Sequence, residues 1–246
     1  CQRRKWDPVS SIIHVLDEAT RNKIAAGEVV ERPASCIKEL VENAIDAGAH
    51  AIEVEIADGG QSYMRVTDDG CGMSPEDAHK CIIRHGTSKI SSVEDIFAIT
   101  SLGFRGEAVP SIAAVSHMQI TTRQASDDFA THLILDGGKI TAEDQAGAPV
   151  GTTMEVSDLF YNTPARRKFL KTNATELNNI VAAYERIVLV YPAISFTLHS
   201  NGAEMMNLRA GSLRQRITDV FGRRISQDLL PVEVDTALCR IRGYVG

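Results

Sequence analysis

Two polar residues one helical turn apart are the strongest candidates for chemistry in this chain. Glu39 and Asn43 lie in the stretch Lys38–Gly48, where the apolar residues keep the spacing of a helix packed on a core. A carboxylate in this position can act as a general base, and a carboxamide beside it can bind a metal ion. The competing interpretation is a solvated helix face, on which Glu42 and Asp46 would be further surface acids.

Three further segments carry residues suited to binding a nucleotide. Asp68-x-Gly-x-Gly72 follows a predicted strand, and its acid can accept a hydrogen bond from an exocyclic amine. Gly103–Glu107 leads into a predicted helix, where backbone amides can bind phosphate, and Lys89 is a candidate phosphate contact. In Gly151-Thr152-Thr153 a hydroxyl could support a base. Each of these segments, taken singly, has a simpler explanation. Asp68–Gly72 has the sequence of an ordinary turn, Lys89 is explained as a solvated lysine, and Thr152 and Thr153 are explained as β-branched residues of a strand.

The elements that must position these residues follow from hydropathy and turn chemistry. Helices are predicted over Asp17–Val30, Pro33–Gly48, Val93–Ile99, Glu107–Val115, Thr163–Leu170 and Leu213–Phe221, and from Ser74 and Thr175 onward. Strands are predicted over Ala51–Ala57, Ser62–Thr67, Met118–Arg123, Thr131–Leu135, Thr152–Val156, Ile194–His199, Glu204–Arg209, Leu229–Val234 and Cys239–Val245. Asn201-Gly202 is the strongest hairpin turn among them.

The composition is that of an ordinary globular protein of 246 residues, 43% hydrophobic and 24% charged. Its longest apolar run, Ile187–Tyr191, is far short of the roughly 20 residues that span a bilayer, and no secretory signal is visible. The five cysteines contain no C-x-x-C pair, which favours a reducing compartment and argues against a zinc site. The net charge of −6 excludes a generally basic nucleic-acid binder but allows a local basic patch.

In their order and spacing, these motifs resemble those of the GHKL ATPases, the superfamily of gyrase B subunits, ninety-kilodalton heat-shock chaperones and sensor histidine kinases. Longer strings are similar to the MutL family of DNA mismatch repair proteins, and the resemblance runs from about Ile13 to the end of the chain. These strings are Ile24–Ser35, Glu39–Asn43, Asp46–Gly48, Arg84–Lys89, Ser101–Ala108 and Asp158–Phe169.

The resemblance implies an α+β fold of the GHKL (Bergerat) type. This is a two-layer α/β sandwich with a mixed, mainly antiparallel sheet and helices on one face. It also implies a disordered leader over 1–12, an ATPase domain over 13–210, and the beginning of a second, transducer-type (ribosomal-S5-like) domain over 211–246. The chain begins at Cys1 and ends in a predicted strand, so we expect it to be a fragment.

The resemblance assigns roles to the candidate residues. Glu39 would be the general base that activates water for attack on the γ-phosphate of ATP, and Asn43 would hold Mg²⁺. Asp68 would recognise the adenine amine, with Gly72 close to the base and Thr152 supporting it. The other nucleotide-binding residues, some of them in a lid over the phosphates, would be Asp46, Met73, Thr87, Ser88, Lys89, Leu102, Gly103, Phe104, Arg105, Gly106 and Glu107.

Two departures from the family pattern affect these expectations. Asp69 stands where many relatives carry Asn, and its charge is expected to weaken nucleotide affinity slightly. Relatives also carry a lysine in the second domain that reaches the γ-phosphate, beyond the end of this chain. We therefore expect the fragment to hydrolyse ATP poorly.

The implied function is that of a mismatch repair ATPase. Mg-ATP would order the lid and drive N-terminal dimerisation, as a homodimer or a MutL-family heterodimer, into a clamp on DNA. That clamp would couple recognition by a MutS-type partner to repair, in the cytoplasm with the nucleoid if bacterial or in the nucleus if eukaryotic. The alternatives are a type II topoisomerase ATPase subunit and a nucleotide-binding scaffold without turnover.

Basic residues offer a candidate surface for non-specific contact with the DNA backbone. Its centre would be Arg166, Arg167, Lys168 and Lys171, with contributions from Arg209, Arg214, Arg216, Arg223 and Arg224. A solvated charged face explains the same cluster equally well.

Overall fold

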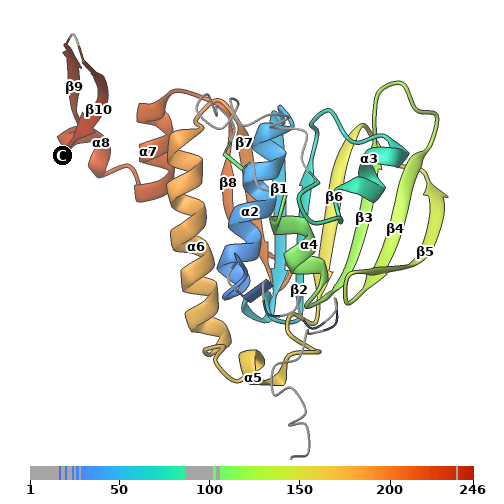
Figure 1. Cartoon of the computed structure of the whole chain (residues 1–246). Coiled ribbons are helices and arrows are strands. Elements are labelled where there is room, and N and C mark those ends of the chain that lie inside the picture. The colour runs from blue at the N-terminus through green and yellow to red at the C-terminus, as the bar shows by residue number, and fades with distance from the viewer. Residues whose placement is uncertain are drawn as a thin grey trace, which may run out of the picture.

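An eight-stranded sheet forms the centre of the computed structural model, which describes residues 17, 20, 24, 26, 27, 29–86, 102, 103, 106–236 and 238–246. The strand order is β5-β4-β3-β6-β2-β1-β7-β8, and β1 and β7 form its parallel pair among otherwise antiparallel neighbours (Figure 1). The strands are β1 (Ala51–Ala57), β2 (Tyr63–Asp68), β3 (His117–Arg123), β4 (Ala130–Asp136), β5 (Lys139–Ala146), β6 (Gly151–Ser157), β7 (Ser195–Ser200) and β8 (Ala203–Leu208).

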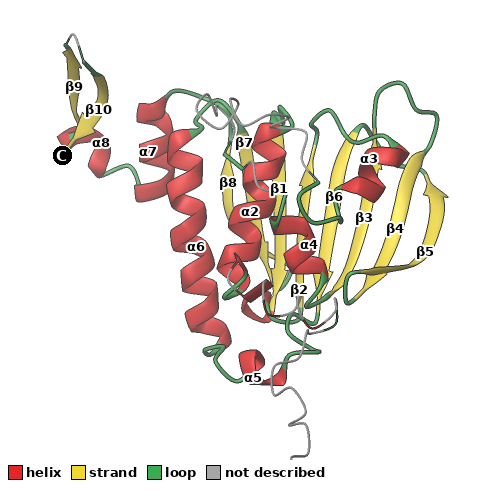
Figure 2. Ribbon diagram, viewed as in Figure 1, coloured by secondary structure: helices red, strands yellow, loops and turns green. Residues whose placement is uncertain are grey.

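Helices cover one face of this sheet, as Figure 2 shows. The largest are α2 (Pro33–Asp46) and α6 (Asn173–Val190), with the shorter α4 (Ala108–Ala113) beside α2. The remaining short elements are α3 (Pro75–Lys80), α5 (Pro164–Arg167), α7 (Leu213–Phe221), α8 (Ile225–Asp228) and the 3₁₀ turn η1 (Asp58–Gly60). A separate hairpin consists of β9 (Leu230–Asp235) and β10 (Arg240–Val245). The expected α+β fold, with a mainly antiparallel sheet and helices on one face, is confirmed.

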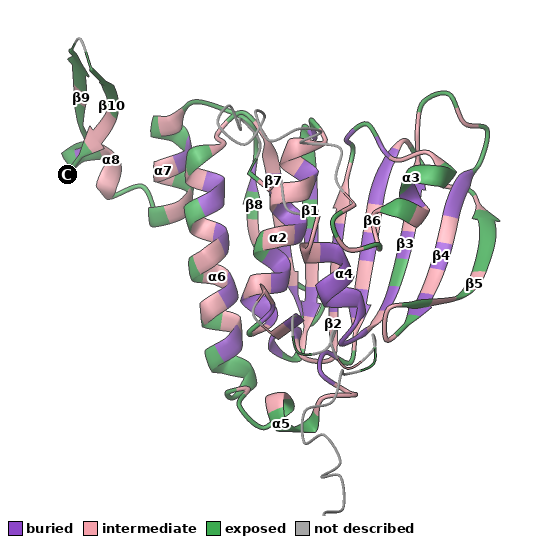
Figure 3. Ribbon diagram, in the orientation of Figure 1, coloured by how far each residue is buried: buried purple, intermediate pink, exposed green. Residues whose placement is uncertain are grey.

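The core lies between the helices and the sheet (Figure 3). Alternate residues of each strand point to opposite faces, so Ile52, Val54 and Ile56 of β1 are all buried beneath the helices. The predicted apolar stripe of α2 meets them, with Ile37 and Val41 fully buried. Burying this stripe leaves the polar side of α2 free to form the wall of a cavity.

Several predicted boundaries differ from the observed ones. Strand β5 was not predicted, because its mostly exposed, polar sequence shows no apolar alternation. Helix α6 begins at Asn173 with Thr172 as its cap, two residues before the predicted start, and α5 ends at Arg167 rather than Leu170. The Thr163 side chain makes no capping hydrogen bond to α5. The predicted helix Val93–Ile99 and the leader 1–12 lie outside the described residues.

Helix α7, which follows the expected domain boundary between residues 210 and 211, is anchored to the preceding elements through Arg216. This residue is 1% exposed, and its guanidinium donates to the carbonyl oxygens of Val188 and Ile194, both at 2.6 Å. It lies 5.3 Å from the centre of the Phe196 ring. The expectation that Arg216 contributes to a DNA-binding surface is therefore wrong, since packing against the end of α6 removes this side chain from solvent.

Candidate active site

The polar side of α2 forms one wall of a cavity of about 1180 Å³. Eleven of the predicted catalytic and nucleotide-binding residues line this cavity, although they come from separate parts of the chain. They are Glu39, Asn43, Asp46, Asp68, Gly72, Met73, Leu102, Gly103, Gly106, Glu107 and Thr152. The other five predicted residues lie outside the described residues; they are Thr87, Ser88, Lys89, Phe104 and Arg105.

Glu39 and Glu42 differ in their surroundings although both are acids on α2. Lys38 contacts both of them, with its Nζ at 2.8 Å from Glu42 and 3.2 Å from Glu39. Glu39 lines the cavity and remains 28% exposed, whereas Glu42 does not belong to the cavity wall. Of the two carboxylates, Glu39 is therefore the one placed to act on a bound ligand.

Asp68 lies at the end of β2, where burial changes its acidity. Loss of solvent, together with the nearby charge of Asp69, raises the pKa of Asp68 to about 6, although hydrogen bonds from the backbone amides of Gly70 and Thr152 oppose the shift. The Gly70 amide lies 2.9 Å from the Asp68 carboxylate. A partly buried acceptor of this kind can select a ligand that brings its own N–H donor.

Asp69 has a structural role in the same loop. Its carboxylate accepts hydrogen bonds from the amides of His50 at 2.7 Å and Ala51 at 2.8 Å, which join the loop to the start of β1. The side chain is exposed and does not line the cavity. The expected effect of Asp69 on nucleotide affinity stays a prediction. Asp69 would exert this effect through the pKa of Asp68, which its charge helps to raise.

Packing within the protein explains why residue 72 is a glycine. Gly72 has a φ of +68°, and a Cβ there would lie 2.0 Å from the carbonyl oxygen of Arg123. The neighbouring Thr122 is 1% exposed, accepts a hydrogen bond from the Met73 amide at 2.9 Å and lies 3.0 Å from the Thr152 hydroxyl. Sequence reasoning missed Thr122, because an isolated threonine in a strand has no distinguishing pattern.

The glycine-rich segment, of which Leu102, Gly103 and Gly106 are described, is joined to the end of α2 through Asp46. The Asp46 carboxylate accepts hydrogen bonds from the amides of Leu102 at 3.0 Å and Gly103 at 3.2 Å. Leu102 was expected to bind nucleotide, and the Gly103 backbone was expected to contribute to phosphate binding, but in this conformation both amides donate to Asp46. The segment is thereby placed beside the helix that carries Glu39 and Asn43.

Glu107 also lines the cavity and contacts two side chains of the segment before it. Its carboxylate lies 3.0 Å from Arg84 Nη1 and 3.0 Å from His85 Nδ1. Both partners also line the cavity, although neither was among the predicted site residues. The sequence feature that could have identified Arg84 and His85 as site residues is their position inside the string Arg84–Lys89. In this conformation the Glu107 side chain is directed to Arg84 and His85.

The donor set fits a magnesium ion shared with a phosphate-bearing ligand. Mg²⁺ prefers oxygen ligands and is commonly held by one or two protein groups together with substrate phosphates. Asn43 supplies a carboxamide oxygen on the cavity wall, one turn from Glu39. Across the described part of the chain, no group of three or more His, Cys, Asp or Glu side chains is placed to hold a metal by itself.

The predicted DNA-binding residues divide into two kinds. Arg167, Lys168 and Lys171 are exposed on or just after α5. Arg166 is only half-exposed, and its Nη1 donates to the carbonyl oxygen of Val30 at 3.2 Å. The four basic residues therefore do not form one uniform surface.

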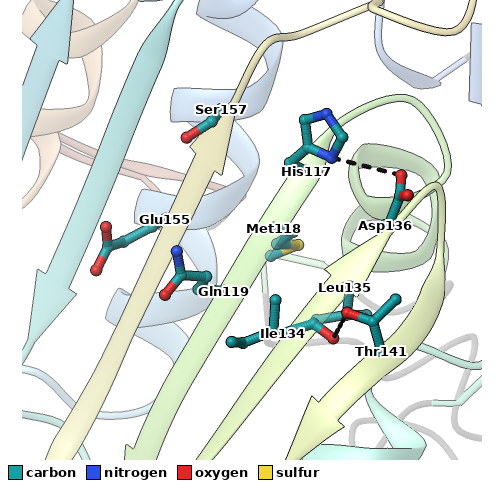
Figure 4. A pocket seen from close by; sticks show the side chains of 9 residues that line it. All are labelled: His117, Met118, Gln119, Ile134, Leu135, Asp136, Thr141, Glu155 and Ser157. Carbon is teal, nitrogen blue, oxygen red and sulfur yellow. Dashed lines mark hydrogen bonds and ion pairs between the residues drawn. The ribbon is translucent and has the colours of Figure 1, made fainter.

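A second cavity, of about 260 Å³, lies on the sheet face away from the helices. Figure 4 shows its lining side chains, with His117 and Asp136 directed toward one another at a distance of 3.4 Å. The His117 ring also stacks on Tyr161, at 4.1 Å between ring centroids. None of the predicted site residues belongs to it, so the cavity beside α2 is the candidate active site.

Comparison with known proteins identifies this architecture. A family model of the histidine kinase-, DNA gyrase B- and HSP90-like ATPases matches residues 31–159, more than half of the chain. The chain belongs to this ATPase family. The matched range contains every described residue of the predicted nucleotide site, from Glu39 to Thr152.

Comparison with individual relatives is more specific than the family model. The chain is 52% identical over 238 residues to the DNA mismatch repair protein MutL of Phocaeicola vulgatus, covering 97% of the chain and 38% of that protein. The MutL protein of Bacteroides fragilis is 51% identical over 237 residues, covering 96% and 38%. The solved Aquifex aeolicus MutL ATPase domain complexed with ADP matches with a TM-score of 0.66 and 32% identity, covering 84% of this chain and 73% of that chain.

These findings confirm the resemblance to the N-terminal ATPase region of the MutL family. The chain spans about two fifths of the length of the curated relatives that it matches, 38% in both cases above. Among the described residues, the helices are too short or too polar to cross a membrane.

Proposed function

We propose that this chain binds Mg-ATP in the cavity beside α2 and is the ATPase module of a MutL-type mismatch repair protein, with only weak hydrolysis by the chain alone. The observation that supports this most strongly is the gathering of eleven predicted residues, from separate parts of the chain, around one cavity. The relative solved with ADP supports a nucleotide as the ligand.

Glu39 would accept the proton of the attacking water. A carboxylate at the cavity wall can orient this water and receive its proton as the new P–O bond forms. Asn43, one turn further along α2, would hold Mg²⁺, which when bound neutralises negative charge on the phosphates. Placing base and metal ligand on one rigid helix keeps their separation constant during the reaction.

Asp68 would recognise the adenine ring. Its carboxylate can accept a hydrogen bond from the exocyclic amine, which guanine lacks at the corresponding ring position. Thr122 and Thr152 would support this loop, since the Thr122 hydroxyl links the Met73 amide to the Thr152 side chain. Gly103–Glu107 and Lys89 would close over the phosphates as a lid.

The finer steps of the function extend this proposal. ATP would order the lid and promote N-terminal dimerisation, as a homodimer or a MutL-family heterodimer, into a clamp on DNA. A MutS-type partner would supply mismatch recognition, and the exposed Arg167, Lys168 and Lys171 would contact the DNA backbone. The expected place of action is the cytoplasm, with the nucleoid, as its bacterial relatives suggest.

The test is ATP binding and turnover with Mg²⁺ in a full-length parent protein, comparing Glu39→Ala and Asn43→Ala. Glu39→Ala should retain ATP binding and lose at least about 100-fold in turnover, the usual scale for a general base. Asn43→Ala should lose binding as well. Binding without turnover in the unmodified protein would instead support a nucleotide-binding scaffold. Unchanged turnover in both variants would overturn the assignment.

A further inference from the structure

Arg166 and Gly27 meet where α5 packs against the segment preceding α2. Arg166 Nη1 donates to the carbonyl oxygen of Val30 at 3.2 Å. A Cβ on Gly27 would lie 1.1 Å from Arg166 Nη2 and 1.8 Å from its Cζ. The guanidinium therefore occupies the space that any larger residue 27 would need.

The segment that receives this contact is packed into the core. Ala26 and Val30 are both fully buried, and the Val30 amide donates to the Ala26 carbonyl at 2.8 Å, as in a helical turn. The Val30 carbonyl thus lies at the end of a turn, where a cation is favourable. At the other end of the contact, the Arg166 amide donates to the Thr163 carbonyl at 3.0 Å, which holds the start of α5.

This contact lies close to the entry of the helix that carries the candidate base. Val30 precedes Pro33, the first residue of α2, by only three positions. The cap position, Arg32, makes no side-chain hydrogen bond to α2, so its own side chain does not secure the entry. Arg166, 136 residues away in sequence, supplies a long-range hydrogen bond just before this entry.

We propose that Arg166 is a positioning residue that fixes Gly27 and Val30, and through them the entry of α2, against α5. In this role its guanidinium is directed into the protein, whereas the neighbouring Arg167 and Lys168 are exposed. A Cβ at position 27 would displace the guanidinium from its place beside Val30. Only the catalytic consequence, through Glu39, rests on the proposed ATPase function.

Two variants break this contact in different ways. Arg166→Ala removes the donor and a positive charge, whereas Gly27→Ala keeps the charge but displaces the guanidinium. In the full-length parent protein, both should raise amide hydrogen exchange at Val30 by about tenfold, the scale of one charge-assisted hydrogen bond. Since they break the same contact, the double variant should exchange no faster than Arg166→Ala alone.

Kinetics and DNA binding separate positioning from other roles. Arg166→Ala and Gly27→Ala should lower kcat several-fold with little change in KM, and Arg166→Lys should restore part of the loss by donating one hydrogen bond to Val30. Arg186→Ala, an exposed arginine on α6, should leave exchange and turnover unchanged. Arg167→Ala provides the comparison for DNA, since loss of a phosphate contact reduces the salt dependence of binding.

The proposal is overturned if Arg166→Ala reduces the salt dependence of DNA binding as much as Arg167→Ala while exchange at Val30 stays unchanged. Unchanged exchange in Gly27→Ala would overturn it as well. Should the parent protein show no ATPase activity at all, the exchange measurements still decide the positioning role, so failure of the proposed function is distinguishable.

Discussion

The Asp46 carboxylate accepts a hydrogen bond from the Gly103 amide at 3.2 Å, which joins residues 57 positions apart in the chain. The same carboxylate accepts a second hydrogen bond, from the Leu102 amide at 3.0 Å. Asn43 lies one turn before Asp46 on α2, so the contact sets the distance between the glycine-rich segment and the candidate metal ligand.

Replacing Asp46 with Ala should release this segment. We expect faster hydrogen exchange of the Leu102 and Gly103 amides without nucleotide. We also expect roughly tenfold weaker ATP binding, because the hydrogen bonds that hold this segment in place before ATP binds are lost, and a tenfold change corresponds to about the free energy of one charge-assisted hydrogen bond. Asp46→Asn keeps one acceptor oxygen and should show a smaller effect. Isothermal titration and exchange mass spectrometry measure the two quantities.

Glu42→Ala is the matched control for Asp46, because Glu42 is an acid on the same helix that pairs with Lys38 outside the cavity. It should leave both quantities unchanged. Tighter ATP binding in Asp46→Ala would contradict the expectation, since it would mean that the carboxylate competes with phosphates for the two amides.

The pKa of Asp68 predicts a particular dependence of stability on pH. Burial raises this pKa from 3.8 to about 6, so between these values the folded protein binds more protons than the unfolded chain. The free energy of unfolding should therefore fall as pH rises from about 4 to 6, by at most about 3 kcal/mol from this residue. Nucleotide-free Asp68→Asn should lack that part of the decrease.

Denaturant titrations at several pH values measure this difference, with Asp69→Asn as a comparison. Asp69→Asn should lower the pKa of Asp68 and reduce the pH dependence only in part, because Asp69 is the lesser cause of the shift. Parallel pH profiles for the unmodified protein and Asp68→Asn would show that the Asp68 carboxyl is not perturbed by burial.

Arg216 should contribute strongly to stability. Arg216→Ala leaves several buried carbonyl oxygens without their donor, among them those of Val188 and Ile194, so we expect a loss of about 3 kcal/mol or more. Chemical denaturation measures it. The nearby Arg214 is exposed, and its Nη2 donates to the Ser226 carbonyl of α8 at 2.9 Å, so Arg214→Ala should cost about 0.5 kcal/mol or less. Similar losses in the two variants would exclude the anchoring role of Arg216.

Local patterns allowed much of the fold to be predicted. The apolar stripe of α2 and the Glu39–Asn43 spacing depend only on the helical period, and the Asn201-Gly202 turn depends on local backbone preference. The strand β5 was missed because an edge strand with polar residues lacks the alternation that burial imposes. Thr122 was missed because its importance comes from its buried partners rather than from its type.

The sequence by itself determined which residues are candidates for chemistry, because their types, order and helical spacing are properties of the chain. Only the tertiary structure decided how individual charged side chains are used. Arg166 bonds Val30 while Arg167 is exposed, and Arg216 is buried while Arg214 is exposed, although each pair is close in sequence. The physical reason is that these side chains bond backbone groups that are distant in the chain. Arg166 bonds Val30 and Asp46 bonds Gly103, and folding alone brings these groups within hydrogen-bond reach.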